Sequence, residues 1–291
     1  MKIGINFQLT DSTPHPAELA RQCEALGFES MFVNEHVVFP VGAKTPYLAN
    51  PKEPIPEYYA HCLEPFIALA MAAVATTKMR LGTCISLVAE HEPIALAKEI
   101  ATLDHLCGGR LIFGVGAGWL REEAEVMGVD FRRRWKVAVE YLRAMKELWT
   151  KTEASFDGEF VKFPLVKCYP KPAHKPHTPI HIGAGGLGTA AIERALRNTV
   201  AVGDGWMPAG LNPEQLKQAL ATLKRMCEEA GRDFNAIEKS MCVAQLKKAA
   251  ARAAIEQYGA AGAHRVIPIV GGADFDKDPD VVEKTAEAFL R

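Results

Sequence analysis

The segment 108-GGRLIFGVGAGWLREEAEVMG-128 raises the first structural question, because Gly114, Gly116 and Gly118 alternate at the end of an apolar run. A dinucleotide-binding loop needs the pattern G-x-G-x-x-G, whose third glycine packs a helix against a strand. Here Trp119 stands where that third glycine would be, and an indole does not fit the tight turn. Glycines at every second position of a strand instead leave one face bare, so that a flat ligand or another backbone can come close.

The length of 291 residues suits one large domain with a substantial core, and we expect a single domain over residues 1–291. The chain has 34 basic and 35 acidic residues, and a formal net charge of −1 gives no overall attraction to nucleic acid or membrane. We therefore expect neither as a partner. No signal peptide or transmembrane segment is apparent, and seven scattered cysteines without a C-x-x-C pair favour reduced thiols in the cytoplasm.

Short apolar, β-branched runs alternate with helical patterns, which predicts repeated βα units around a parallel sheet. The expected strands are 2–9, 30–36, 79–88, 110–118, 179–185, 200–208, 237–244 and 263–271. Eight such units favour an α/β protein with a (β/α)₈ TIM barrel. A doubly wound open sheet is the alternative, but it would favour a glycine fingerprint after the first strand, and 8-QLTDSTPHP-16 has none.

Helices are expected over 16–28 and 212–231, because each begins near a proline and ends near a glycine. Two connections are too long for simple loops. Residues 37–62 form an insertion after strand two, and their five prolines favour an ordered excursion near the face where barrel active sites are built. Residues 150–178 form an insertion before strand five, and the alternating runs of 153–163 predict a hairpin.

Catalytic groups of such a barrel come from the carboxyl ends of its strands. The second expected strand ends in 34-NEH-36, where His36 can exchange a proton near neutral pH. Glu35 points to the opposite side if the strand stays regular. We interpret His36 as a catalytic or ligand-binding residue in preference to a structural one. After the fifth strand, the four glycines of 182-IGAGGLGT-189 precede a helix and favour a phosphate site built from backbone N–H groups.

Other polar groups are less specific. We expect no metal site at three histidines in a proline-rich run without carboxylates or cysteines, His174, His177 and His181. The basic run 132-RRRWK-136 is typical of a solvated helix face. Ligand contact and helix capping are both open for the third strand end, Glu90, His91 and Glu92. Trp206 could wall a pocket or fill the barrel interior.

The chain resembles the luciferase-like monooxygenase family, and within it the branch that uses the deazaflavin coenzyme F420. The resemblance covers nearly the whole chain, and its most specific motifs are 110-RLIFGVGAGWLREEAEVMGVDFRRR-134, 136-KVAVEYLRAMKELW-149, 179-PIHIGAGG-186 and 203-GDGWMP-208. It implies that the alternate glycines belong to the fourth barrel strand, where a flat ring system approaches.

The resemblance also implies roles for individual residues. His36 matches a histidine beside the reactive edge of the ring, and Glu35 stands where relatives often have an acidic residue. A non-prolyl cis peptide that supports the ring is implied between Cys84 and Ile85, next to Thr83. The remaining implied cofactor contacts are Gly116, Gly118 and Trp119 on strand four, and the phosphate loop of Gly183, Ala184, Gly185, Gly186 and Leu187. Sugar-phosphate dehydrogenases of the family carry a catalytic glutamate where this chain has Trp119.

The implied activity is hydride transfer between F420 and a small organic substrate, with His36 as proton donor or acceptor. An FMN-dependent monooxygenase that uses reduced flavin and oxygen is the nearest alternative, because both coenzymes have similar ring and phosphate sites in sequence. A non-redox lyase or isomerase for sugar phosphates is a second alternative, but it would need a lysine or metal carboxylates at strand ends. The resemblance further implies a homodimer, and the apolar segment 65–77 is compatible with one.

Overall fold

The computed structural model describes residues 1–48, 50–184 and 188–291. In this part of the chain, eight parallel strands pair in a closed ring. In ring order they are β1 (Lys2–Phe7), β2 (Ser30–Val33), β3 (Arg80–Thr83), β5 (Leu111–Gly116), β8 (Ile180–Ala184), β9 (Gly205–Pro208), β10 (Glu238–Val243) and β11 (Arg265–Val270). The predicted (β/α)₈ barrel is confirmed, and an open sheet is excluded.

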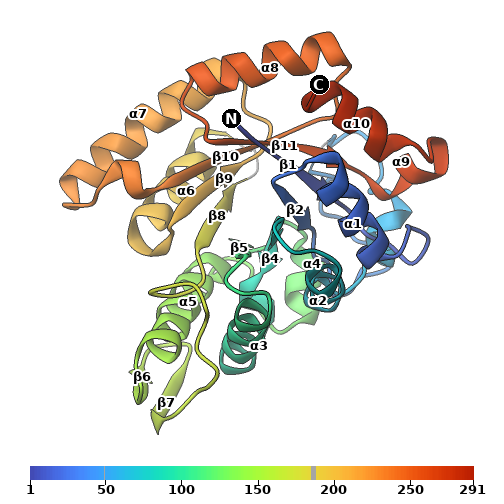
Figure 1. The fold of residues 1–291 in the computed structure, drawn as a ribbon. Coiled ribbons are helices and arrows are strands. Elements are labelled where there is room, and N and C mark those ends of the chain that lie inside the picture. The colour runs from blue at the N-terminus through green and yellow to red at the C-terminus, as the bar shows by residue number, and fades with distance from the viewer. Residues whose placement is uncertain (49, 185–187) are drawn as a thin grey trace.

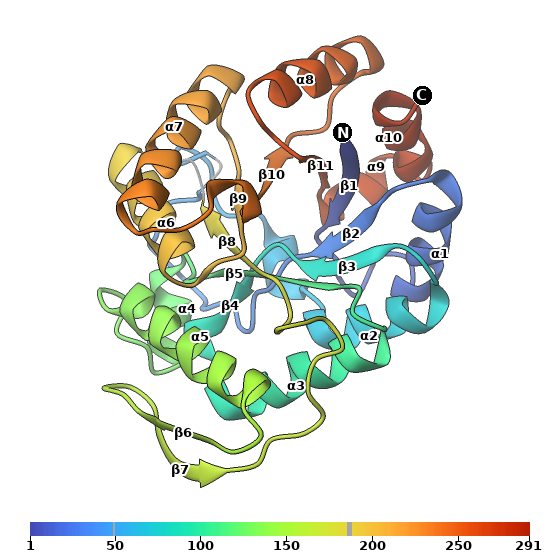
Figure 2. The ribbon, with the colours of Figure 1, turned by 60° about the vertical axis from the view of Figure 1, so that its left-hand side comes forward.

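Helices surround the ring of strands (Figures 1 and 2). They are α1 (Pro16–Leu26), α2 (Pro65–Ala75), α3 (Pro93–Leu106), α4 (Arg121–Val126), α5 (Arg134–Thr150), α6 (Thr189–Val202), α7 (Pro213–Glu229), α8 (Lys248–Ala260), α9 (Gly272–Lys277) and α10 (Val281–Phe289). Three short 3-10 turns are η1 (Glu57–His61), η2 (Val88–Glu90) and η3 (Phe234–Ala236). Among the described residues, no helix is long and apolar enough to cross a membrane.

The two helices expected from sequence end where their capping residues indicate. Helix α1 stops before Gly27, whose φ of 101° is a left-handed conformation that glycine adopts without steric strain. Helix α7 begins with a capping box, in which Asn212 and Gln215 each bind the other's backbone N–H. These local hydrogen bonds explain why the boundaries could be predicted.

Two expected strands needed correction. The strand predicted over 200–208 begins only at Gly205, because residues 200–202 complete helix α6. The β-branched side chains there suggested a strand, but Thr199 and Val202 continue the buried helical face that begins at Ala195. The strand predicted over 79–88 is interrupted by a cis peptide bond between Cys84 and Ile85. A short strand, β4 (Ser86–Leu87), resumes after the interruption and pairs with β5.

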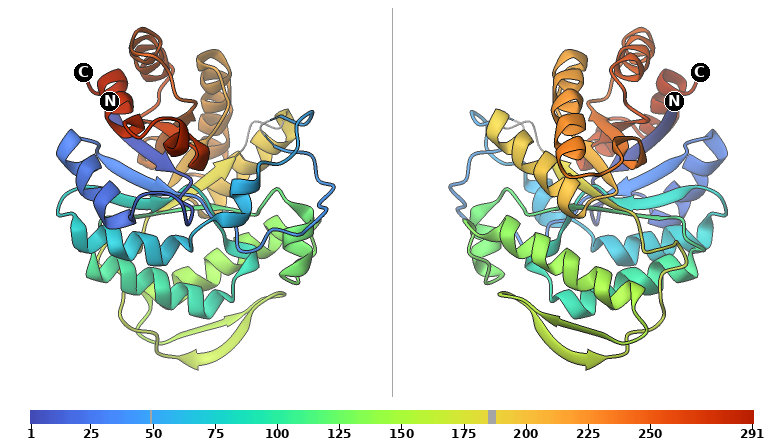
Figure 3. Two further views of the ribbon diagram at one scale, coloured as in Figure 1. Left: turned by 90° about the vertical axis from the view of Figure 1, so that its right-hand side faces the viewer. Right: turned by 90° about the vertical axis from the view of Figure 1, so that its left-hand side faces the viewer.

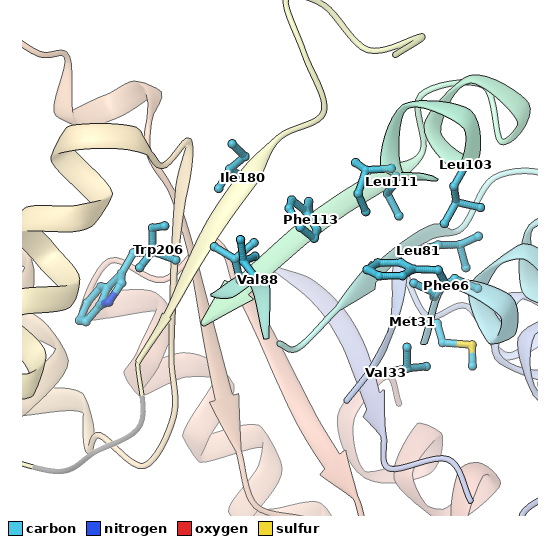
Figure 4. Close-up of a cluster of buried hydrophobic side chains, with 14 of the residues drawn as sticks. Met31, Val33, Phe66, Leu81, Val88, Leu103, Leu111, Phe113, Ile180 and Trp206 are labelled. Atoms are coloured by element: carbon cyan, nitrogen blue, oxygen red, sulfur yellow. The ribbon is translucent and has the colours of Figure 1, made fainter. Parts of the chain in front are cut away.

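Among the described residues, buried side chains form two hydrophobic clusters, one inside the ring and one outside it. The inner cluster draws on strands from all around the barrel, and its members can meet only in the interior: Phe32, Ile112, Met207, Cys242 and Ile267. The outer cluster lies between strands and helices, and Figure 4 shows part of it, including Leu81, Phe113 and Phe66.

Trp206 belongs to the outer cluster and is completely buried. Since neighbouring strand residues point to opposite faces and Met207 points inward, Trp206 points toward the helices. Figure 4 shows it on the outer side of β9. Both expectations for this residue, a pocket wall and an interior filler, are therefore wrong.

A buried ion cluster closes the amino-terminal end of the barrel. The guanidinium of Arg265 is fully buried, donates two hydrogen bonds to Glu29 at 2.8 and 2.9 Å, and lies 3.0 Å from Glu238. Burial opposes ionisation of Glu238, but Arg265, Lys2 and His181 lower its pKa to about 2. This end of a barrel serves stability, whereas the opposite end carries the site.

Both predicted insertions are present. Strands β6 (Ala154–Asp157) and β7 (Lys162–Val166) form the expected antiparallel hairpin, which lies outside α5 and α3 in Figure 2. The excursion after β2 extends over the carboxyl ends of the strands to helix α4, as Figure 3 shows. There the Glu122 carboxylate accepts hydrogen bonds from the backbone N–H groups of Lys44 and Thr45 at 2.8 and 3.1 Å.

Candidate active site

The alternate glycines of β5 allow the interrupted strand β3–β4 to pack directly on their backbone. A Cβ atom at Gly114 would lie 1.9 Å from the carbonyl oxygen of Thr83, and one at Gly116 would lie 2.4 Å from Cδ1 of Ile85. Thr83 also donates a hydrogen bond of 2.6 Å to the Gly114 carbonyl. The sequence left open whether a flat ligand or another backbone approaches the glycines. In the structure, the backbone of Thr83 and the side chain of Ile85 lie against the bare face of β5.

The interruption forms a bulge, made of Cys84 and Ile85, at the barrel mouth. Both are partly exposed, whereas Thr83 and Ser86 on either side are buried. The thiol of Cys84 lies 3.5 Å from that of Cys242. Cys242 belongs to the inner cluster, and Cys84 packs against that cluster. The structure thus has the cis peptide expected from the family resemblance, and its partly exposed surface is small and apolar.

His36 lies beyond the end of β2 and is held by a residue that sequence reasoning missed. Its Nδ1 is 2.7 Å from Oε2 of Glu123, and both side chains are almost fully buried. The other oxygen of Glu123 accepts the backbone N–H of Val37 at 2.7 Å. A carboxylate bound in this way accepts from Nδ1–H, which leaves Nε2 as the ring nitrogen that can exchange a proton.

Aromatic side chains surround the imidazole of His36. Tyr59 and Trp119 each meet it edge to face, with ring centroids at 5.1 and 5.8 Å. Tyr47 lies next to both, and its hydroxyl oxygen is 3.4 Å from that of Tyr59. Burial, followed by the neighbouring Tyr47, raises the pKa of Tyr59. The insertion after β2 thus supplies two walls of the site, and Trp119, just beyond the end of β5, supplies a third.

Glu35 forms a second buried pair with a histidine. Its Oε1 is 2.7 Å from Nε2 of His91, and its Oε2 accepts the backbone N–H of Leu87. Burial acts to lower the pKa of His91, but Glu35 and the more distant Glu99 and Glu64 outweigh it and raise the pKa. Glu35 thus faces η2 and the start of α3, and its catalytic role stays a prediction.

The three polar residues after β4 have three different environments. Glu92 caps helix α3 by accepting the backbone N–H of Ala95, which fulfils the capping interpretation. His91 pairs with Glu35, as described above. Glu90 is buried next to Gly118, where a Cβ atom would lie 2.8 Å from Oε1 of Glu90. Gly118 also has a left-handed φ of 74°, which glycine adopts without strain, and its expected contact with a cofactor stays a prediction.

Part of the predicted phosphate loop is described. Gly183 and Ala184 end β8, and a Cβ atom at Gly183 would lie 2.5 Å from Cγ2 of Ile85. Gly185, Gly186 and Leu187 lie outside the described residues. Helix α6 starts at Thr189, and its N-cap residue, Gly188, provides no side-chain cap. Gly183 thus packs against Ile85, the described chain resumes just before the N-terminus of α6, and phosphate binding stays a prediction.

The other candidate groups have structural partners. His174 and His177 contact backbone carbonyl oxygens, and burial lowers the pKa of His181 to about 4. No group of three or more metal-ligating side chains occurs in the described part of the chain. In the run 132–136, Arg133 and Lys136 pair with Glu159 on the hairpin.

Sequence reasoning missed Glu123 and Tyr59 and left His91 undecided. Glu123 lies four residues after Trp119 at the start of a short helix, so the spacing offered a weak signal. Tyr59 lies in the insertion after β2, where nothing in the sequence fixes a distance to the second strand.

Residues 8–288 match the family described as luciferase-like monooxygenase. The uncharacterized protein Rv0953c of Mycobacterium tuberculosis is 37% identical over 234 residues, which cover 80% of each chain. The solved structure of the monooxygenase RslO1 from Streptomyces bottropensis matches 100% of this chain and 99% of its own, with a TM-score of 0.75 and 21% identity.

A second solved structure, an F420-dependent secondary alcohol dehydrogenase in complex with an F420-acetone adduct, is similar over 99% of this chain and 96% of its own. Its TM-score is 0.76 and its identity is 20%. At such identities, the two solved structures show that the fold is shared. The sequence match over residues 8–288 carries the family assignment. This chain belongs to the luciferase-like monooxygenase family.

Proposed function

We propose that this protein is an F420-dependent oxidoreductase that transfers a hydride between coenzyme F420 and a small organic substrate. The observation that carries the proposal is the His36–Glu123 pair at the carboxyl ends of the strands. Glu123 holds Nδ1, so Nε2 is left to give or take the proton that accompanies a hydride. The rings of Trp119 and Tyr59 pack against the imidazole, and the His36 side chain is only 6% exposed, which limits its contact with water.

The residues at the barrel mouth fit a flat ring with an anionic tail. Cys84 and Ile85 offer a partly exposed apolar surface, and Ile85 contacts both β5 and β8 through their glycines. Gly183 and the uncapped start of α6 would hold a phosphate group. When bound, F420 supplies the carbon that carries the hydride, while the protein orients the substrate and moves the proton at His36.

An FMN-dependent monooxygenase is the second candidate, favoured by the full-length similarity to the monooxygenase RslO1. The same bulge, phosphate loop and aromatic walls would serve a flavin. The two candidates differ in what must reach the ring. An F420-dependent oxidoreductase needs a substrate that donates or accepts a hydride, whereas an FMN-dependent monooxygenase also needs oxygen.

Binding titrations of F420 and FMN to the purified protein test both candidates. Tight F420 binding with weak FMN binding supports the proposal, the reverse supports the monooxygenase, and binding of neither favours the non-redox barrel. Ile85→Lys should abolish binding of either ring, because it places a charge on the bulge. Leu106→Lys is the matched control, since that side chain is 77% exposed on α3.

We also propose that the protein is a cytoplasmic homodimer. All seven cysteines are free thiols, which supports a reducing compartment. Helix α2 exposes an apolar stripe at spacings of three and four residues, namely Ile67, Met71 and Val74. Ile67→Glu should convert a dimer into a monomer, as light scattering would show. If the Ile67→Glu variant keeps the mass of a dimer, the contact between subunits does not involve this stripe of α2.

A further inference from the structure

A third buried carboxyl group lies beside the two glutamate–histidine pairs. The Glu90 residue is 5% exposed, and among the described residues neither of its oxygens has a hydrogen-bond partner. Glu35 and Glu123, by contrast, each accept a backbone N–H and contact an imidazole nitrogen at 2.7 Å. Of these three carboxyl groups, Glu90 is the one that has no donor to stabilise a negative charge.

The charged groups that face Glu90 come from three elements. Glu123 on α4 and Glu35 beyond β2 oppose its ionisation, and Arg134 on α5 favours it. Arg134 is engaged elsewhere, however, because it donates to the carbonyl oxygens of Gly118 and Phe131, while in the described structure neither oxygen of Glu90 has a hydrogen-bond partner. Burial, with Glu123 and Glu35 next in size, raises the pKa of Glu90 to about 8.

We propose that Glu90 holds a proton at neutral pH and that the loss of this proton in mildly alkaline solution changes the proton affinity of His36 through Glu123. The proton passes to a base in the solvent, and no bond between heavy atoms changes. An added negative charge beside Glu123 stabilises the protonated form of the His36 ring. Glu90 is therefore a positioning residue for proton transfer, and only this consequence rests on the proposed function.

Magnetic resonance of the cofactor-free protein tests the proposal. The protein is labelled with ¹³C at glutamate carboxyl and histidine ring carbons and titrated from about pH 5 to pH 10. We expect one glutamate signal to move in the alkaline range, and the ring signals of His36 to move at the same pH. Glu90→Gln should remove both changes, because glutamine is a neutral analogue of the protonated acid.

Glu125→Gln is the matched control, because Glu125 is an exposed residue on the same helix as Glu123. It should keep both changes. The proposal is overturned if the alkaline step at His36 persists in the Glu90→Gln variant, or if the parent protein has no glutamate that titrates in the alkaline range. The second outcome needs no variant, so a folding defect cannot obscure it.

The same samples separate this proposal from the proposed function. F420 or FMN binding is measured independently of the titration, so a failure to bind F420 leaves the result for Glu90 intact. If F420 binds and a substrate is found, the alkaline limb of the kcat profile should lose the Glu90 step in Glu90→Gln and keep it in Glu125→Gln. A purely structural role would change activity equally at every pH.

Discussion

Replacing Glu90 with glutamine should make the stability of the protein less dependent on pH. An acid whose pKa rises on folding binds more protons in the folded state, so its ionisation lowers stability as pH rises from the unfolded pKa to the folded one. For Glu90 this window runs from 4.5 to about 8. At about 1.4 kcal/mol per pKa unit, the parent loses at most about 3 kcal/mol of stability through this group between pH 4.5 and 7.

The glutamine variant has no such loss, because its amide does not ionise. Its side chain still lacks a partner at this site, which could cost about 1–3 kcal/mol at every pH. The informative quantity is therefore the difference in unfolding free energy between variant and parent, and this difference should change by up to about 3 kcal/mol in favour of the variant from pH 4.5 to pH 7.

Urea denaturation at several pH values between 4.5 and 8 measures that difference directly. Glu125→Gln, on an exposed side chain of helix α4, should follow the parent at each pH. A difference between parent and Glu90→Gln that stays constant over the whole range would refute the assignment of a buried, protonated Glu90.

Four other substitutions test three separate parts of the structure. His36→Ala should lower kcat by about 10²–10⁴-fold once a substrate is found, and a loss of only a few-fold would contradict its role as proton donor or acceptor. Gly114→Ala should destabilise the protein more than Gly116→Ala in urea denaturation. A Cβ atom at position 114 would lie 1.9 Å from the carbonyl oxygen of Thr83, whereas one at position 116 would lie 2.4 Å from the end of the Ile85 side chain, which can move. Equal losses of stability would argue against the tight backbone contact at Gly114. Arg265→Met should cost about 3–5 kcal/mol at neutral pH, since Glu29 and Glu238 would lose their buried partner, and thermal unfolding that matches the parent would show that the ion cluster is not required.

The alternating glycines illustrate why a sequence pattern can be read correctly and still be incomplete. Their spacing excluded a nucleotide loop and indicated that something approaches the bare face of a strand. What approaches is the backbone of Thr83 and the side chain of Ile85. The ring expected from the family resemblance would therefore rest on the bulge formed by Cys84 and Ile85, and strand β5 would support that bulge from behind.

The sequence by itself determined the elements of the barrel and their order. Strand runs, the Asn212 cap of α7, Gly27 after α1 and the hairpin were all readable, because each depends on residues only a few positions apart. The error over residues 200–202 arose where local composition and helical packing disagreed.

Only the tertiary structure decided which groups meet at the site. Glu123 and His36 are 87 positions apart, and Glu35 and His91 are 56 apart, so no local pattern could pair them. Their distances are fixed when eight strands close into a ring and their carboxyl ends converge on one face. Closure also buries Glu90 where no donor of the described chain reaches it, and that environment, which no single segment contains, gives the carboxyl group its raised pKa.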